Sequence, residues 1–246
     1  MPRHARRKST TGFYHILLRG VGRQNIFVDE EDKQRFFETI ARYKQELHFE
    51  LHAYCFMGNH VHLLMKDATD HLDQIMKKIA GSYAYYFNTK YERTGHLFQD
   101  RFGSEVIEDD TYYLTVLRYI HQNPVKAGIS RMECYPYSSY GEYMGEPKII
   151  DKQFAIDLLG DKDKLILFLH QEEQSCCLDD VVRNVITDTK AKEILSKKYH
   201  LKNFIVIQQL EPKKRDYLLQ MLKKEGMSIR QLERLTGLNR GIIQRV

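Results

Sequence analysis

The chain has 246 residues, of which 42% are hydrophobic and 29% charged, proportions that fit a folded globular protein and exclude wholesale disorder. The net charge is +5 and the pI is near 8.8. Basic residues cluster at Arg3, Arg6, Arg7 and Lys8 and again at residues 213–215, which suits phosphate contact as well as it suits a solvated surface.

The apolar periodicity predicts strands at residues 13–19, 49–57, 60–66 and 102–108, the middle two forming a hairpin around Gly58-Asn59. Helices are predicted from Asp29, a candidate cap, to about residue 48, from about 71 to 91, and from 110 to 122, where we expect Pro124 to stop the helix. This order predicts an α+β fold with a ferredoxin-like antiparallel sheet backed by helices.

Residues 130–150 are rich in Tyr, Ser, Gly and Pro, and we interpret them as a connector packed on the first domain. Beyond it the chain reads as short helices without clear strands. We therefore predict a domain over residues 1–145 and a small all-α region over 146–246. Its end, at about 212–246, resembles a helix-turn-helix that would offer Arg240, Gln244 and Arg245 to DNA, with a plain helical hairpin as the alternative.

A pair of histidines, His60 and His62, lies in the third predicted strand. Residues i and i+2 of a strand share a face, so both imidazoles could bind one cation. Chance alone supplies roughly half such a pair in a chain with this many histidines, so the pair by itself favours two hydrogen-bonded histidines on a half-buried strand, and the surrounding residues change that weighting. Val61 and Leu63 would place the alternate face in the core and leave both imidazoles on the other.

Tyr119 and Asn123 are four residues apart on the predicted helix and so share one of its faces. Two nitrogen ligands, one oxygen ligand and a tyrosine nucleophile would suffice to cut a phosphodiester. Asn123 also precedes Pro124, so an ordinary cap at the C-terminal end of the helix is an alternative role for it.

Three sequence blocks resemble those of single-tyrosine HUH transposases, and most closely the REP-associated tyrosine transposases. The blocks are Gly58–Leu64 (GNHVHLL), Gly95–Phe102 (GHLFQDRF) and Arg118–Gly128 (RYIHQNPVKAG). Gly58 stands where the family often has Pro, Phe98 where Trp is common, and Asn123 where insertion-sequence relatives have Gln.

The resemblance covers residues 10–145 and implies an HUH nuclease fold. It implies that His60, His62 and Asn123 bind a divalent metal, Mg²⁺ or Mn²⁺, and that Tyr119 is the catalytic nucleophile. It also implies cleavage and rejoining of single-stranded, hairpin-forming repeat DNA through a 5′-phosphotyrosine intermediate.

Two further side chains are candidates for DNA contact. Arg101 could clamp a phosphate, although an exposed loop arginine explains it as well. Among the tyrosines near residue 85, Tyr83 and Tyr86 fall on the apolar stripe of their helix, and Tyr85 is left to stack on an unpaired base.

The main alternative to a transposase is a domesticated relative that binds DNA sequence-specifically without cleaving it. A histidine-triad hydrolase is excluded because no third alternate histidine follows His62. Four cysteines without a Cys-x-x-Cys pair argue against a zinc ribbon or a disulfide scaffold. With no apolar stretch long enough for a membrane span, we expect a cytoplasmic, nucleoid-associated protein, either a monomer or a homodimer.

Overall fold

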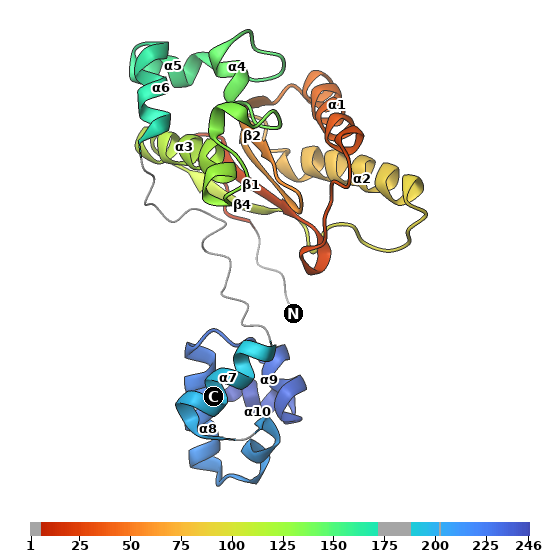
Figure 1. The fold of residues 1–246 in the computed structure, drawn as a ribbon, viewed down its shortest axis with the longest axis vertical. Helices are drawn as coiled ribbons and strands as arrows, with labels where there is room; N and C mark the ends of the chain where they lie inside the picture. The colour runs from red at the N-terminus through yellow and green to blue at the C-terminus, as the bar shows by residue number, and fades with distance from the viewer. Residues whose placement is uncertain (1–5, 172–187, 202) are drawn as a thin grey trace. The chain divides into compact units, whose positions relative to one another are not determined.

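The computed structural model describes residues 6–171, 188–201 and 203–246 and divides the chain into two compact units, with the division between residues 171 and 188 (Figure 1). Each unit has its own hydrophobic core. None of the described helices combines the length and the apolar character that crossing a membrane requires.

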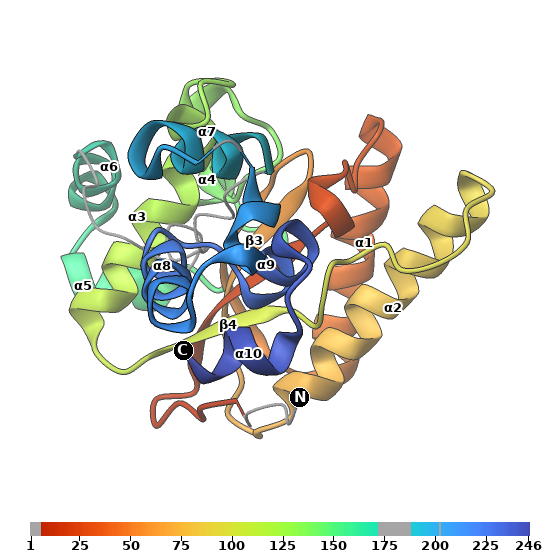
Figure 2. The ribbon, with the colours of Figure 1, turned by 90° about the horizontal axis from the view of Figure 1, so that it is seen from below.

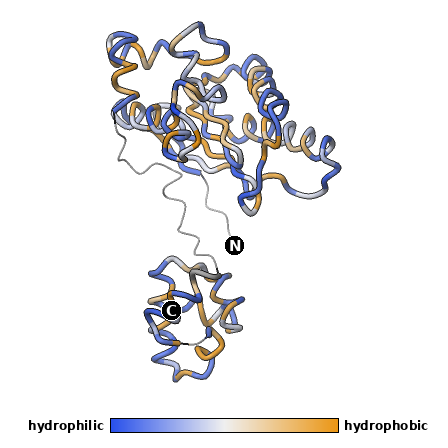
Figure 3. The backbone as a smooth tube through the Cα atoms, in the orientation of Figure 1, coloured by the Kyte–Doolittle hydropathy of each residue, from blue (hydrophilic) through white to orange (hydrophobic). Residues whose placement is uncertain are grey.

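The first unit is built on a four-stranded antiparallel sheet of β1 (Phe13–Arg19), β2 (Glu50–Phe56), β3 (His60–Lys66) and β4 (Gly103–Ile107). The strand order is β2-β3-β1-β4, which is the order of a ferredoxin-like sheet and confirms the predicted fold class. β1 lies in the middle and is apolar on both faces, as a strand covered on both sides must be. Figure 3 shows this apolar colouring in the strands and mixed colouring along the helices around them.

Helices cover both faces of the sheet (Figures 1 and 2). On one face lie α1 (Glu30–Leu47) and α2 (Leu72–Lys90), which pack side by side and bring Phe36 and Tyr83 onto each other, with Phe36 also against Phe56 of β2. On the other face lies α3 (Asp110–Lys126), whose Tyr113 contacts Phe13 of β1. Asp29 caps α1 as predicted, within a reciprocal capping box with Asp32.

The prediction that α3 stops before Pro124 is wrong, because the helix continues to Lys126 with the proline inside its last turn. A proline there removes only the hydrogen bond to the Ile120 carbonyl. The turn is closed instead by Ala127, whose N–H donates to the Asn123 carbonyl at 3.0 Å. The helix end is Ala127, so Asn123 is not its C-terminal cap, and that alternative role is also excluded.

The segment after α3 packs on the first unit, as expected for residues 130–150. It contains a 3₁₀ turn, η2 (Met132–Cys134), and α4 (Tyr140–Met144). Buried Glu142 accepts hydrogen bonds from the Tyr54 hydroxyl of β2 and from the N–H groups of Lys148 and Ile149. This carboxylate therefore joins both sides of the segment to the edge of the sheet.

The first unit extends further than residue 145, the boundary predicted from composition. α5 (Gln153–Leu159) and α6 (Lys162–His170) belong to its core through Ala155, Leu165 and Leu169, and the side chain of Gln122 on α3 donates to the Leu169 carbonyl at 2.8 Å. From the sequence alone, short helices with one apolar face could belong to either unit. The packing contacts assign α5 and α6 to the first.

The second unit is helical, with α7 (Asp188–Tyr199), the 3₁₀ segment η3 (Phe204–Gln209), α8 (Pro212–Lys224), α9 (Ile229–Thr236) and α10 (Arg240–Arg245). Its core includes Leu219, Leu232 and Ile243 from the last three helices. Ser228 caps α9, and Gly237, in the left-handed region at φ +69°, turns the chain into α10. Three short helices joined in this way have the order of a helix-turn-helix.

Candidate active site

The sheet register brings the two predicted histidines onto the face that α3 covers. In β1 and β3, Leu17 lies opposite His62 and Arg19 lies opposite His60, and directly opposed residues of an antiparallel pair share a face. The two imidazole rings lie 5.0 Å apart between centroids. They point away from the face on which α1 and α2 pack.

α3 places Tyr119 over these histidines. The Tyr119 ring centroid lies 5.6 Å from that of His62, with the rings nearly perpendicular. One helical turn later, Asn123 lies close enough to His60 to influence its pKa, and its side-chain amide donates to the Tyr119 carbonyl at 3.0 Å. The structure therefore brings together all four side chains that the sequence proposed for the chemistry.

Burial keeps both imidazoles neutral. Desolvation lowers the pKa of His60 to about 4; the charge of Arg19 acts in the same direction, and Asn123, as an acceptor for the protonated ring, opposes it. Desolvation also lowers the pKa of His62 well below its usual value, together with the neighbouring imidazoles of His15 and His60 and with Arg19. Neutral imidazole is the form that binds a metal ion.

The two histidines contact their supporting residues through the same ring atom, Nδ1. His60 Nδ1 lies 2.6 Å from Asn59 Oδ1, and His62 Nδ1 lies 3.0 Å from His15 Nε2. This leaves Nε2 of each ring as the atom that would bind a metal. Among the described residues no three His, Cys, Asp or Glu side chains gather into a metal site, so Asn123 or the substrate would have to supply the oxygen ligands.

Three residues of the site were not singled out in the sequence. His15 contacts His62 and lies 5.9 Å from the Tyr119 ring between centroids. Lys126 holds its ammonium 4.6 Å from the centre of the Tyr119 ring. Arg19 is half-buried opposite His60, and its pKa is lowered by burial and by Arg23, with Tyr119 acting in the opposite direction. The contacts of His15 and Arg19 cross between elements, so no spacing along the chain indicates them.

The predicted DNA contacts lie in different places. Arg101 is exposed in the segment before β4 and lines a groove of about 750 Å³ beside α2. In the same segment the Gln99 N–H donates to the Arg19 carbonyl at 2.9 Å, so the segment lies beside the strand end that carries the site. Tyr85 is 77% exposed on α2, in the helical layer opposite Tyr119, and lines a second groove with Lys77 and Lys78. The structure does not bring Tyr85 to the catalytic side chains.

The remaining candidates, Arg240, Gln244 and Arg245, lie on α10 in the second unit. Gln244 and Arg245 are exposed, and two arginines on one short helix are compatible with DNA contact.

Comparison with known proteins agrees with this fold and identifies a family. The family model described as "Transposase IS200 like" matches residues 8–123, a range that ends at Asn123. A REP-associated tyrosine transposase of Haemophilus influenzae is 33% identical over 120 residues, which cover 42% of this chain and 67% of that protein. The chain therefore belongs to the REP-associated tyrosine transposases, which are enzymes that cleave and rejoin DNA.

A solved structure agrees on the fold. A REP-associated tyrosine transposase bound to a REP hairpin superposes with a TM-score of 0.51 at 19% identity, over 59% of this chain and 87% of the other. A transposase of Deinococcus radiodurans gives a TM-score of 0.36 at 18% identity, over 49% of this chain and 96% of the other.

Proposed function

We propose that the protein is a metal-dependent single-stranded DNA endonuclease and strand transferase that forms a 5′-phosphotyrosine intermediate. The observation that carries the proposal is the position of the Tyr119 ring, 5.6 Å from His62 on the sheet face that also presents His60. A water nucleophile would give hydrolysis alone, whereas a tyrosine conserves the phosphodiester energy for rejoining.

The donor set fits a divalent cation such as Mg²⁺ or Mn²⁺. His60 and His62 would hold it through Nε2 and Asn123 through its amide oxygen, with the DNA phosphate providing further oxygens. When bound, such a cation supplies Lewis-acid polarisation of the scissile phosphate and stabilises charge on the departing oxygen.

In the proposed reaction the Tyr119 hydroxyl oxygen releases its proton to water and attacks phosphorus, the bond from phosphorus to the 3′ oxygen breaks, and the departing oxygen takes up a proton from water. The products are a 5′-phosphotyrosine and a free 3′-OH. Attack by a second 3′-OH then reverses the step, joins the strands and restores the phenol. A free phenol has a pKa of about 10. Positive charge beside the developing phenolate, as Lys126 provides at 4.6 Å from the ring centre, favours its ionised form.

Tyr119 is only 2% exposed. A phosphate cannot reach a hydroxyl on so little open surface, and binding of the DNA must therefore turn the ring or move its neighbours. Asn123 supports the backbone of this turn by donating to the Tyr119 carbonyl at 3.0 Å.

We further propose hairpin-forming repeat DNA as the substrate. The solved relative is bound to a REP hairpin, and this chain carries cationic groups outside the catalytic centre that suit such DNA. Arg101 would contact backbone beside the site, and Tyr85 would stack on an unpaired base. In the second unit Arg240, Gln244 and Arg245 would contact duplex DNA.

The test uses labelled single strands from the flanks of the gene, incubated with the protein and Mn²⁺ and resolved on a denaturing protein gel. We expect a covalent protein–DNA adduct for the parent and its loss, by about 10³-fold or more, for Tyr119→Phe. The matched control is Tyr112→Phe, which removes a half-buried hydroxyl from the same helix and should leave the adduct unchanged. An undiminished adduct in Tyr119→Phe would refute the assignment, and DNA binding with no adduct under any divalent metal would favour the non-cleaving relative.

A further inference from the structure

We propose that His15 is a positioning residue that holds His62 in the tautomer whose Nε2 lone pair faces the active site. The inference rests on the proposed function, since it assumes that His62 Nε2 binds the metal. It begins with one contact, the 3.0 Å separation of His15 Nε2 and His62 Nδ1.

The contact is fully enclosed. Both histidines are completely buried, and their rings lie 5.2 Å apart between centroids in a stacked arrangement. His15 sits on the central strand β1, opposite Leu64, and so is a diagonal neighbour of His62 on the same face. Water cannot replace either partner without opening the core between the sheet and α3.

Two neutral imidazoles can share a hydrogen bond in only two ways. If His62 Nδ1–H donates to His15 Nε2, then His62 Nε2 carries a lone pair toward the site. If His15 Nε2–H donates instead, then His62 Nε2 carries a proton and cannot bind a cation. The choice between these two arrangements therefore decides whether the site can hold a metal.

A carboxylate on the neighbouring strand β4 is compatible with the first arrangement. Glu105 of β4 is directly opposite His15 in the register of β1 and β4, so the two share a face. Its buried Oε2 has no hydrogen-bond partner among the described residues, and neither has His15 Nδ1. The two atoms do not contact each other in the structure. A proton on His15 Nδ1, as in the first arrangement, would let it donate to this carboxylate after a side-chain rotation, whereas the lone pair of the second arrangement would not.

His60 also donates through Nδ1, and its partner there can only accept. Asn59 donates through Nδ2 to the Arg23 carbonyl at 3.3 Å, which fixes its Oδ1 toward His60 Nδ1 at 2.6 Å. An amide oxygen only accepts, so His60 Nδ1 must donate. His15 therefore does for His62 what Asn59 does for His60, and it does so without adding a negative charge directly beside an incoming phosphate.

The test measures Mn²⁺ binding to the DNA-free protein by electron paramagnetic resonance, for the parent, His15→Leu and His15→Gln. Leucine removes the acceptor, and glutamine restores one at a similar reach. We expect His15→Leu to weaken Mn²⁺ binding by about 10- to 100-fold and His15→Gln to recover most of the loss. The matched control is His52→Gln, which replaces another fully buried histidine of the sheet and should leave Mn²⁺ binding unchanged.

A second readout does not depend on either variant folding. In the Mg²⁺-loaded parent, ¹⁵N nuclear magnetic resonance should show the His62 proton on Nδ1. A proton on His62 Nε2, or Mn²⁺ binding by folded His15→Leu equal to that of the parent, would overturn the proposal. The proposed function has a separate test, in which His60→Ala should lose the Mn²⁺ binding of the parent. If the parent does not bind Mn²⁺, so that the two proteins behave alike, the proposed function is overturned rather than the role of His15.

Discussion

The face of the sheet that α3 covers holds several histidines that burial keeps uncharged. Desolvation lowers the pKa of His15 to about 3 and that of His121 to about 4, and it acts in the same direction on His60 and His62. His121 lies outside the site and holds Ser139 Oγ at 2.8 Å, which ties α3 to the segment before α4. Such groups make the folded state sensitive to acid.

The sign of the effect follows from where the protons bind. Below pH 6.5, the ordinary histidine pKa, histidines in the unfolded chain bind protons, whereas the buried rings of the folded protein remain neutral. Protonation therefore favours the unfolded state, and the stability that these histidines contribute above pH 6.5 is lost as the pH falls toward 4. We expect the free energy of unfolding in EDTA to fall below pH 6.5 by up to about 1.4 kcal/mol per pH unit for each such histidine. Denaturant melts at several pH values measure it. His121→Gln should show a shallower dependence, and a flat profile in the parent would contradict the argument.

The parts of the site that the sequence predicts are those defined by short-range geometry. His60 and His62 share a face because side chains of a strand repeat every two residues. Tyr119 and Asn123 share a face because a helix completes a turn about every 3.6 residues. His15 lies 47 residues from its partner, and its role depends on which strand is the neighbour of β3 and in which register. The periodicity of a single strand does not predict which strand pairs with it or in which register.

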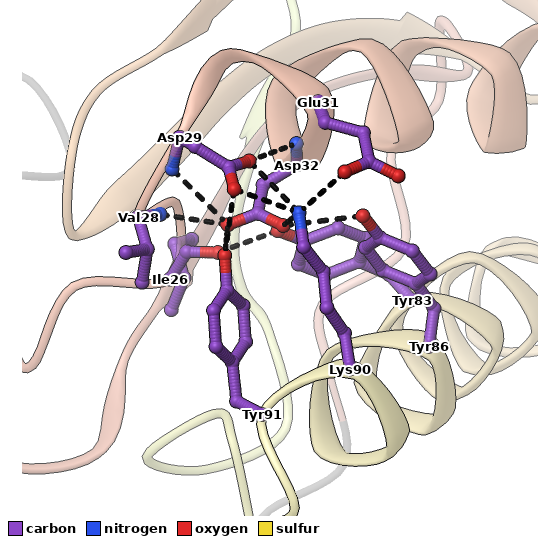
Figure 4. A network of polar contacts seen from close by, with 9 residues as sticks. All are labelled: Ile26, Val28, Asp29, Glu31, Asp32, Tyr83, Tyr86, Lys90 and Tyr91. Atoms are coloured by element: carbon purple, nitrogen blue, oxygen red, sulfur yellow. Dashed lines mark hydrogen bonds and ion pairs between the residues drawn. The ribbon is translucent and has the colours of Figure 1, made fainter.

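Among the secondary-structure elements, α1 and α2 are joined by a network of polar contacts around Lys90 and buried Asp32 (Figure 4). Lys90 Nζ lies 2.8–3.0 Å from carboxylate oxygens of Asp29, Glu31 and Asp32, and the Tyr91 hydroxyl donates to Asp32 at 2.8 Å. Asp32 also accepts from the Val28 N–H. The network thereby fixes the chain before α1 against the end of α2.

The Tyr83 hydroxyl supports the same region by donating to the Ile26 carbonyl at 2.5 Å. Tyr83→Phe would leave that buried carbonyl without its donor, and we expect it to destabilise the protein by about 1–3 kcal/mol. The control is Tyr85→Phe, two residues along the same helix and 77% exposed, which should be neutral. Equal unfolding midpoints of the two variants in urea would show that the bond contributes nothing.

The sequence predicts the identities of the elements better than their boundaries, and for physical reasons. Proline breaks a helix interior, but near the last carbonyls of α3 it removes a single hydrogen bond, so the helix runs past Pro124. The composition shifts over about residues 130–150, where we predicted a boundary at 145, yet the packing of the first unit continues through α6. That packing comes from contacts such as Gln122 with the Leu169 carbonyl, which no local pattern shows.

Charge is divided unevenly between the two parts of the chain. Residues 188–246 contain 14 Lys and Arg against 6 Asp and Glu, a net +8, whereas residues 1–187 contain 24 against 27, a net −3. The net negative charge of residues 1–187 opposes long-range attraction to DNA, although basic residues cluster locally within this part. We therefore expect the second unit to supply the favourable long-range attraction to DNA, and it carries the helix-turn-helix order of α8, α9 and α10.

This division predicts how duplex affinity responds to salt. Each phosphate contact contributes about −0.9 to the slope of log affinity against log salt concentration, so Arg240→Ala with Arg245→Ala should flatten that slope by about 1.8. Fluorescence anisotropy of a labelled hairpin across a salt series measures it. Lys192→Ala with Lys197→Ala removes the same charge from α7 and serves as the control, with a smaller change in slope expected because these residues lie outside the three-helix motif. Equal slopes for the two double variants would mean that the unit attracts DNA by its total charge alone and that α10 makes no specific contact.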